Sequence, residues 1–224
     1  DSDGSTELSY EIENWASSTT GANIWVKVPQ VNGTSTSDSI YVYYGNASAA
    51  DGQNATSVWS NGYEAVWHLN DTPTGNPSDI RDSTVNAHHG SSTGSMDSTD
   101  QTPGQVGGSL TFDGGTTQGL QFPDHNNWDT GTSKFTWEAW VKTTDTQFGI
   151  MSRIDGSNEW YPLTGLDYGL QSGSALNGYY HNGEAAALII TTSTSVVVDG
   201  TWRHVAGTRD GSLFNLYIDG VLAK

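Results

Sequence analysis

The sequence predicts an all-β fold, in which a β-sandwich follows a smaller β module. Seven Asp-Gly and four Asn-Gly dipeptides are spread along the 224 residues, and such pairs favour the tight turns that join neighbouring strands. Apolar and polar residues alternate in several short segments, whereas no long segment repeats with the 3.6-residue period of a helix. A chain of this length can bury a substantial core.

The clearest strands lie in the C-terminal part of the chain, where apolar residues recur at every second position. The residues expected on the apolar faces of two strands are Phe135, Trp137, Ala139 and Val141, and Phe214, Leu216 and Ile218. Asp210-Gly211 and Asp219-Gly220 bracket the second strand and predict tight turns at both of its ends.

The pattern also predicts the environment of three tryptophans and one acidic residue in the C-terminal part of the chain. We expect Trp137, Trp140 and Trp202 to pack inside the fold or against a partner sheet, because their segments are apolar. Glu138 is a lone acid between apolar neighbours, and an outward position accounts for it most simply.

The first 58 residues are predicted to form a separate, smaller module. Alternation of apolar residues predicts strands at Leu8 to Glu13, Ile24 to Val28 and Ile40 to Tyr44. A polar stretch follows, and we place the linker at 59–62 and the larger module at 63–224.

The charge of the chain limits the classes of partner that it can bind. Asp and Glu number 25 against 8 Lys and Arg, for a formal net charge of -17. Nucleic acid is an unsuitable partner because phosphate binding requires clustered Lys and Arg. Anionic surfaces would be repelled, so a neutral glycan or a surface glycoprotein is favoured. Molar salt screens such self-repulsion, so the acidity is typical of a halophilic or marine protein, with an ordinary acidic secreted protein as the alternative.

Three segments carry a resemblance to a known family. They are Ala65-Val-Trp-His-Leu-Asn-Asp71, Asp82-Ser-Thr-Val-Asn-Ala-His-His-Gly90 and Gly107-Gly-Ser-Leu-Thr-Phe-Asp-Gly-Gly115, in that order ahead of Phe135. Residues 63–224 thereby resemble the laminin-G-like, concanavalin-A-type jelly roll. The family's chain normally continues past the turn after Ile218. The resemblance therefore implies either that this module is truncated at its C-terminus or that a strand from another chain completes its open edge.

The first module resembles a different family. Ile24-Trp-Val-Lys-Val-Pro29 followed by Ser39-Ile-Tyr-Val-Tyr-Tyr-Gly-Asn-Ala-Ser-Ala49 is similar to a domain of unknown function in prokaryotic surface proteins, usually found just ahead of a laminin-G-like module. Only the second half of that domain's pattern is recognised, so the module is expected to be incomplete.

The sequence offers no convincing catalytic carboxylates. Glycan-cleaving relatives of the jelly roll carry alternating Glu-x-Asp-x-Glu on one strand, a run that does not occur in this chain. Glu11 and Glu13 share one strand face, for which a solvated surface is the simplest interpretation. The chain is therefore predicted not to be an enzyme.

Calcium is the metal that the resemblance implies, because it is common in this superfamily. Its oxygen ligands would come from Asp82 and Asp113. Asp113 precedes a glycine, so plain turn chemistry is an equal alternative for it.

For ligand binding, the best candidates are aromatic residues gathered between predicted strands. Aromatic rings stack on sugar rings while amides and carboxylates bind hydroxyls. The predicted ligand-binding residues are Trp160, Tyr161, Tyr168, Tyr179 and His181. Because alternate strand residues face opposite ways, some of these rings are expected in the core.

These observations predict a non-catalytic recognition or adhesion module that binds glycan or protein ligands. It is expected to be extracellular or on a cell surface, or on a viral attachment fibre, without membrane insertion. One alternative is a structural subunit of a surface filament, completed by strands from neighbouring copies. Another is an accessory module of a polysaccharide-degrading enzyme.

Overall fold

A computed structural model gives the fold and confirms the all-β prediction. It describes residues 4–15, 21–115, 117–128, 130, 133–145, 148–153, 166–172, 176–182, 188–191, 197–211 and 213–224. The chain forms two compact units, Asp1–Pro123 and Asp124–Lys224. The predicted linker at 59–62 lies inside the first unit. Residues 63–123, which were predicted to belong to the larger module, are therefore grouped with the N-terminal strands in the structure.

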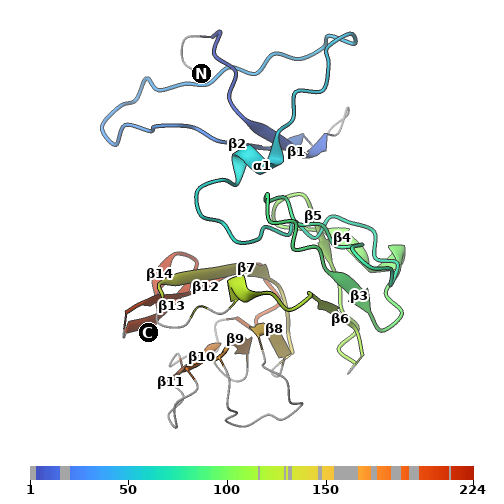
Figure 1. Cartoon of the computed structure of the whole chain (residues 1–224), viewed down its shortest axis with the longest axis vertical. Coiled ribbons are helices and arrows are strands. Elements are labelled where there is room, and N and C mark those ends of the chain that lie inside the picture. Colours follow the sequence, from blue (N-terminus) through green and yellow to red (C-terminus); the bar gives the residue numbers. More distant parts are fainter. Residues whose placement is uncertain are drawn as a thin grey trace. The chain divides into compact units, whose positions relative to one another are not determined.

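The first unit contains three small antiparallel pairs of strands (Figure 1). Its strands are β1 (Tyr10–Trp15), β2 (Ala22–Val26), β3 (Ser91–Thr93), β4 (Gln101–Pro103), β5 (Gly108–Leu110) and β6 (Gly119–Gln121). The pairs are β1 with β2, β3 with β6, and β4 with β5. A short helix, α1 (Ala55–Val58), begins at Asn54, whose side chain accepts a hydrogen bond from Ser57 N. A 3-10 helix, η1, spans Ser98–Asp100.

The predicted strand at Ile40 to Tyr44 does not form. In the described part of the first unit this segment belongs to no strand, although its alternating pattern suits one. Alternation and β-propensity specify only which residues fit a sheet, and a strand also requires a neighbour for its backbone hydrogen bonds.

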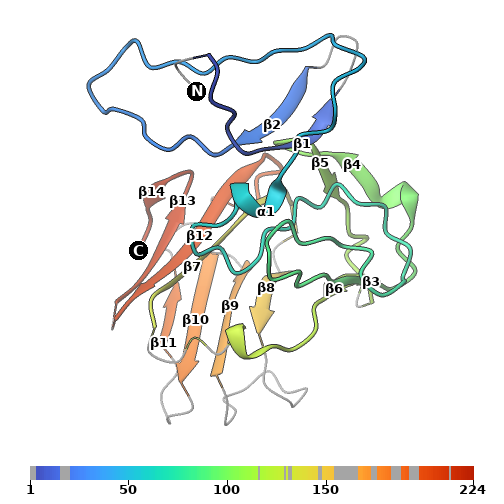
Figure 2. The ribbon, with the colours of Figure 1, turned by 45° about the horizontal axis from the view of Figure 1, so that its top comes forward.

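In the residues that the structure describes, the second unit is a β-sandwich of two four-stranded antiparallel sheets (Figure 2). One sheet has the order β11-β10-β9-β8, and the other has the order β14-β13-β12-β7. The strands are β7 (Phe135–Val141), β8 (Phe148–Arg153), β9 (Leu166–Ser172), β10 (Leu176–Asn182), β11 (Leu188–Thr191), β12 (Arg203–Asp210), β13 (Leu213–Ile218) and β14 (Val221–Leu222). A 3-10 helix, η2, spans Asn126–Trp128.

The predicted apolar faces of β7 and β13 form the core of this sandwich. The buried cluster consists of Trp137, Leu176, Val197, Val205, Phe214, Leu216 and Ile218. A Cβ atom built on Gly178 of β10 would lie 2.5 Å from the ring of Phe214, so the two sheets meet face to face at this point. The turn at Asp219-Gly220 is confirmed, because both residues have positive φ, at 51° and 75°.

Among the described residues, no helix has the length and apolar character needed to cross a membrane.

Candidate functional site

Trp140, in the sheet β14-β13-β12-β7, is exposed on the outer face of the sandwich. Trp137 and Trp140 lie on the same strand, β7, yet Trp137 is 8% exposed and Trp140 is 44% exposed. Alternate residues of a strand point to opposite faces, and these two positions are three apart. Trp137 is confirmed in the core. Trp140 does not pack inside the fold, and the alternative that it packs against a partner sheet stays a prediction.

Two polar side chains lie next to Trp140 on this face. His204 of β12 is directly opposite Trp140 in the register, and the two rings meet nearly edge to face, with centroids 5.3 Å apart. The Nε2 atom of His204 lies 3.5 Å from Oε2 of Glu138, whose side chain is exposed as predicted. An aromatic ring, an imidazole and a carboxylate therefore share one accessible patch.

The pairing of β12 with both of its neighbours extends this patch across the sheet. Glu138 lies opposite Ala206 of β12, and Ala206 lies opposite Tyr217 of β13. Directly opposed residues share a face, so Tyr217 is on the outer face with Trp140. We call the group Glu138, Trp140, His204 and Tyr217 the outer-face patch.

The predicted ligand-binding residues are only partly within the described structure. Trp160 and Tyr161 lie outside the described residues. In the backbone register of the other sheet, Tyr168 is opposite Tyr180, while Tyr179 and His181 are opposite Gly169 and Asp167.

The register separates these predicted positions into two sets. Gly178 faces the core, and residue 180 is two positions along the same strand. Position 180, and position 168 opposite it, therefore lie on the core side of the sheet. Positions 179 and 181 lie on the other side, so positions 168, 179 and 181 do not all share one face of the sheet.

Asp82, the first predicted metal ligand, is surrounded by hydrogen-bond donors. It is 6% exposed, and its carboxylate accepts hydrogen bonds from Val66 N, His88 N, Thr84 N and Thr84 Oγ1 at 2.8 to 2.9 Å. These hydrogen-bond donors stabilise the negative charge of the carboxylate, and a cation that bound the same oxygens would have to displace them. This arrangement does not fit a calcium ion and instead ties together the loops around residues 66–88.

Asp113, the second predicted metal ligand, forms a local turn. Its Oδ1 atom accepts a hydrogen bond from Gly115 N at 2.7 Å, which is the turn chemistry considered as the alternative. Within the described ranges, no group of three or more His, Cys, Asp or Glu side chains is arranged to hold a metal ion. Calcium binding stays a prediction that has no assembled ligand set in this part of the chain.

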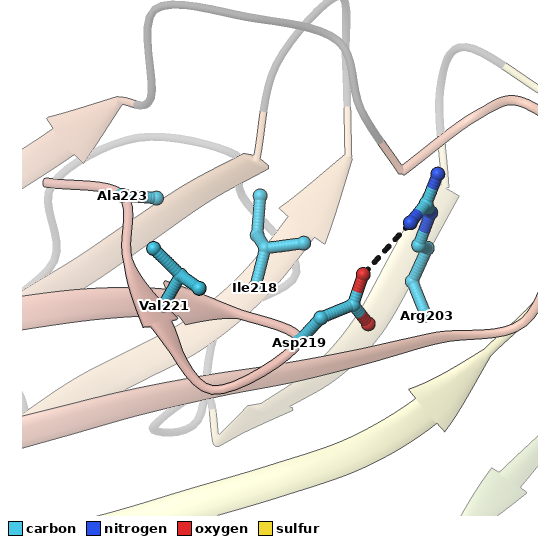
Figure 3. Close-up of a pocket in the computed structure, with 5 residues that line it drawn as sticks. All are labelled: Arg203, Ile218, Asp219, Val221 and Ala223. Atoms are coloured by element: carbon cyan, nitrogen blue, oxygen red, sulfur yellow. Dashed lines mark hydrogen bonds and ion pairs between the residues drawn. The ribbon is translucent and has the colours of Figure 1, made fainter.

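A small concavity lies at the turn between β13 and β14 (Figure 3). Its volume of about 240 Å³ is below the roughly 300–1,000 Å³ of typical ligand pockets. Its lining consists of Arg203, Ile218, Asp219, Val221 and Ala223.

The only cation in this lining, Arg203, is already neutralised. Its Nη1 atom donates to Asp219 at 2.7 Å and its Nη2 atom donates to Asp199. The hydrogen bond from Arg203 holds the pKa of Asp199 well below its usual range and also lowers the pKa of Asp219. The concavity therefore offers little charge to an anionic ligand, and we do not assign the site to it.

Glu11 and Glu13 form a buried polar network in the first unit, and the predicted solvated surface is wrong for them. Their side chains are 15% and 2% exposed. Glu11 accepts hydrogen bonds from Trp59 Nε1 at 2.6 Å and from Ser83 Oγ at 2.6 Å. Glu13 accepts one from Trp25 Nε1 at 2.6 Å.

His68 lies between these two carboxylates. Its Nε2 atom is 3.2 Å from Glu11 and its Nδ1 atom is 3.6 Å from Glu13. The ring stacks on Trp25, with centroids 5.7 Å apart and planes 24° apart. Both ring nitrogens therefore face a carboxylate.

The pKa values of the two carboxyls shift in opposite directions. Burial raises the pKa of Glu13. Burial also acts on Glu11, but hydrogen bonds from His68, Ser83 and Trp59 outweigh it and lower the pKa of Glu11. Since the Ser83 hydroxyl donates to a carboxylate rather than to His68, the arrangement supports a structural network and not an activated nucleophile.

The described strands of the second unit define a β-sandwich module of two antiparallel sheets. Residues 113–224 match the family model described as the concanavalin A-like lectin/glucanases superfamily, and residues 1–131 match the model described as a domain of unknown function, DUF2341. The chain belongs to both families, which confirms the two families noted in the sequence. The matched ranges overlap at residues 113–131, whereas the resemblances were assigned to residues 1–58 and 63–224. No curated protein and no solved structure matches the chain at a significant level.

The sequence itself contained a signal for the outward position of Trp140. In Phe135 to Val141 the odd-numbered positions form the apolar face, and Trp140 is even-numbered. Strand alternation alone therefore places Trp140 beside Glu138 rather than beside Trp137. Its proximity to His204 depends on the register between β7 and β12, which the sequence does not specify.

Proposed function

We propose that the second unit is a non-catalytic recognition module that binds a neutral glycan on the outer-face patch. The observation that carries the proposal is Trp140, a tryptophan that is 44% exposed on a sheet of a concanavalin A-like module. Glu138 and His204 lie beside it. Together these side chains offer one stacking surface and two hydrogen-bonding groups.

The chemistry of this patch matches that of a sugar ring. The C–H face of a pyranose is apolar and packs against an aromatic face, while its hydroxyls require donors and acceptors around the ring. Trp140 supplies the aromatic surface. The Glu138 carboxylate accepts hydrogen bonds from hydroxyls, and the His204 imidazole can donate one.

The charge of the chain favours a neutral ligand. The formal net charge is -17, and Glu138 adds a carboxylate to the patch itself. A sulfated or uronic-acid-rich polysaccharide would meet electrostatic repulsion, which weakens only at high salt. A neutral glycan would bind with little dependence on ionic strength.

The proposal also includes the location of the module and the ligand-binding residues that the sequence predicts. An extracellular location suits a glycan-binding module. The predicted contributions of Trp160, Tyr161, Tyr168, Tyr179 and His181 stay predictions, because their side chains are not among those described.

A glycan array followed by titration calorimetry tests the proposal. We expect a neutral glycan to bind the unmodified chain and Trp140→Ala to weaken that binding by at least about tenfold, as the loss of roughly 1.4 kcal/mol of stacking implies. The matched control is Trp15→Ala, because Trp15 is also exposed, at 51%, but lies in the first unit.

The comparison of these variants decides the outcome. Equal binding by Trp140→Ala and the unmodified chain would move the site elsewhere. Weakening by Trp15→Ala as strong as that by Trp140→Ala would show a general effect of removing a tryptophan and would contradict the proposal. Absence of binding to every neutral glycan would also contradict it.

A further inference from the structure

The first unit holds three titratable side chains in direct contact. Glu11 and Glu13 project from β1, and His68 lies between their carboxylates, 3.2 Å from Glu11 and 3.6 Å from Glu13. The side chain of His68 is 10% exposed, so all three groups are largely shielded from water. We call Glu11, Glu13 and His68 the acid–histidine cluster.

The neutral form of the histidine does not suit this position. A neutral imidazole has one N–H donor, and its other ring nitrogen is an acceptor. Because a carboxylate faces each ring nitrogen of His68, that acceptor would point at a negatively charged oxygen. One additional proton removes this conflict, either as a second N–H on His68 or as a carboxylic O–H on Glu13. The geometry therefore favours a cluster that holds one additional proton between these two residues.

The surroundings of the cluster also favour retention of a proton. The charges that act on the two carboxyl groups come from the cluster itself, from His68 on both and from Glu11 on Glu13. Between Asp1 and Pro123 the sequence contains 10 Asp and 4 Glu but only two Lys or Arg residues, Lys27 and Arg81. The Nζ atom of Lys27 donates to Ser60. An acidic surrounding of this kind stabilises a bound proton.

The carboxylates of the cluster attach β1 to segments that are distant in the sequence. The indole N–H groups of Trp25 in β2 and Trp59 after α1 donate to them, as do the hydroxyl of Ser83 and the backbone N–H of Gly108. A change in the charge of the cluster therefore acts on the contacts that hold β1 and β2 in the unit.

We propose that the acid–histidine cluster is a pH-dependent switch in the first unit. With its additional proton bound, the cluster holds β1 and β2 against the segments that carry Trp59, Ser83 and Gly108. Release of the proton as the pH rises leaves two buried carboxylates beside an uncharged imidazole, and their repulsion loosens this attachment. The switch involves the first unit alone, so it does not depend on the glycan-binding proposal.

The direction of the pH dependence follows from the proton binding of the two carboxyl groups. Burial raises the pKa of Glu13, so its contribution to stability is complete below its unfolded pKa and is lost as the pH rises through its folded pKa. Hydrogen bonds outweigh burial at Glu11 and lower its pKa, so its contribution is lost only as the pH falls through that lowered value. The attachment is therefore strongest in weakly acidic solution and weakens as the pH rises.

Amide hydrogen exchange of the whole chain tests the proposal, after correction for the intrinsic effect of pH on exchange. We expect the protection factors of β1 and β2 to fall at least about tenfold between about pH 6 and about pH 9. About 1 M NaCl is present throughout, because it screens the general repulsion within the acidic chain. Strands β12 and β13 of the second unit are the internal reference, and their protection should stay constant.

A pair of charge-matched variants isolates the cluster. Glu11→Gln keeps an oxygen that accepts from Trp59, and its amide can donate to the Ser83 hydroxyl. Because one carboxylate is gone, loss of the proton no longer leaves two buried charges, and the fall in protection should shrink to less than about threefold. Glu7→Gln removes the same charge at an exposed position of the unit and should keep the full fall.

A third variant gives an independent measurement if Glu11→Gln does not fold. His68→Gln replaces the imidazole by an amide that neither gains nor loses a proton in this pH range. We expect lower protection of β1 and β2 than in the unmodified chain at about pH 6, with less than about a threefold change up to about pH 9.

The proposal is wrong if β1 and β2 of the unmodified chain keep the same protection across this pH range. It is also wrong if β12 and β13 lose protection to the same extent, because the whole chain is then destabilised. A fall in Glu11→Gln or His68→Gln as large as that in Glu7→Gln would show that the pH dependence arises outside the cluster.

Discussion

The two units fill their interiors by different means. In the second unit the buried cluster is apolar, and the ring of Phe214 packs against Trp137 with centroids 5.8 Å apart. The first unit has a smaller apolar cluster around Ile80, Met96 and Leu110. It also buries the carboxylates of Glu11 and Glu13.

This difference shows two ways in which distant segments of a chain are held together. An apolar core gains free energy roughly in proportion to the buried area, so each side chain contributes by its size. A buried carboxylate contributes only while its donors are in place, because an unsatisfied buried polar group is costly. Glu11 alone connects β1 to Trp59, His68 and Ser83, which are 48 to 72 positions away in the sequence.

The largest expected effect on stability comes from truncating a side chain in the apolar core of the second unit. Phe214→Ala should lower the free energy of unfolding of the second unit by about 3–5 kcal/mol, because Phe214 is 4% exposed and its loss leaves a cavity. Leu213→Ala on the same strand is the control, since Leu213 is 65% exposed. Urea unfolding measures both variants, and equal effects would contradict the assignment of the core face.

An intermediate effect is expected when the polar network is broken. Glu11→Ala removes the acceptor for Trp59, His68 and Ser83, and should destabilise the first unit by about 1–3 kcal/mol. Glu7→Ala is the control, because Glu7 is an exposed acid near the same strand. Amide hydrogen exchange in β1 and β2 reports on this unit alone. Unchanged protection in Glu11→Ala would show that the network adds little.

The smallest of these effects is a dependence on pH in the first unit. Burial opposes ionisation of Asp79, but hydrogen bonds from Ser92 and Thr74 outweigh it and lower its pKa to about 2. A carboxyl whose pKa is depressed by folding stabilises the protein above its unfolded pKa of about 3.9. That contribution disappears as the pH falls through about 2.

The variant Asp79→Asn isolates this contribution. It should be less stable than the unmodified chain at pH 7 by an amount on the order of 1 kcal/mol, after allowance for solvent screening. The difference should shrink as the pH falls below about 4. Asp51→Asn, at an exposed position in the same unit, serves as the control. A difference that stays constant from pH 7 to pH 2 would contradict the role of ionised Asp79.

Two strands of the second unit, β7 and β13, could be predicted in most of their detail from local patterns. Phe135 to Val141 and Leu213 to Ile218 alternate strictly, and Asp219-Gly220 provides the turn between β13 and β14. These features depend only on the period of a strand and on the φ angles that a tight turn requires. They are therefore present in the sequence itself.

The predictions from the sequence were wrong where a residue's environment depends on partners that are distant in the sequence. Glu11 and Glu13 were expected in solvent, but Trp25 and Trp59 donate their indole N–H groups to them. Ile40 to Tyr44 was expected as a strand, but no described segment pairs with it. Neither outcome can be inferred from the residues on either side, because burial and strand pairing are properties of the assembled chain.

The sequence by itself determined the class of fold, the turns and which positions of each strand share a face, because these follow from local backbone geometry. Only the tertiary structure decided that Trp140 lies against His204, and that the donors of the loops around residues 66–88 enclose Asp82. Both arrangements depend on contacts between residues far apart in the chain, and the register and packing that produce such contacts are fixed only when the whole unit folds.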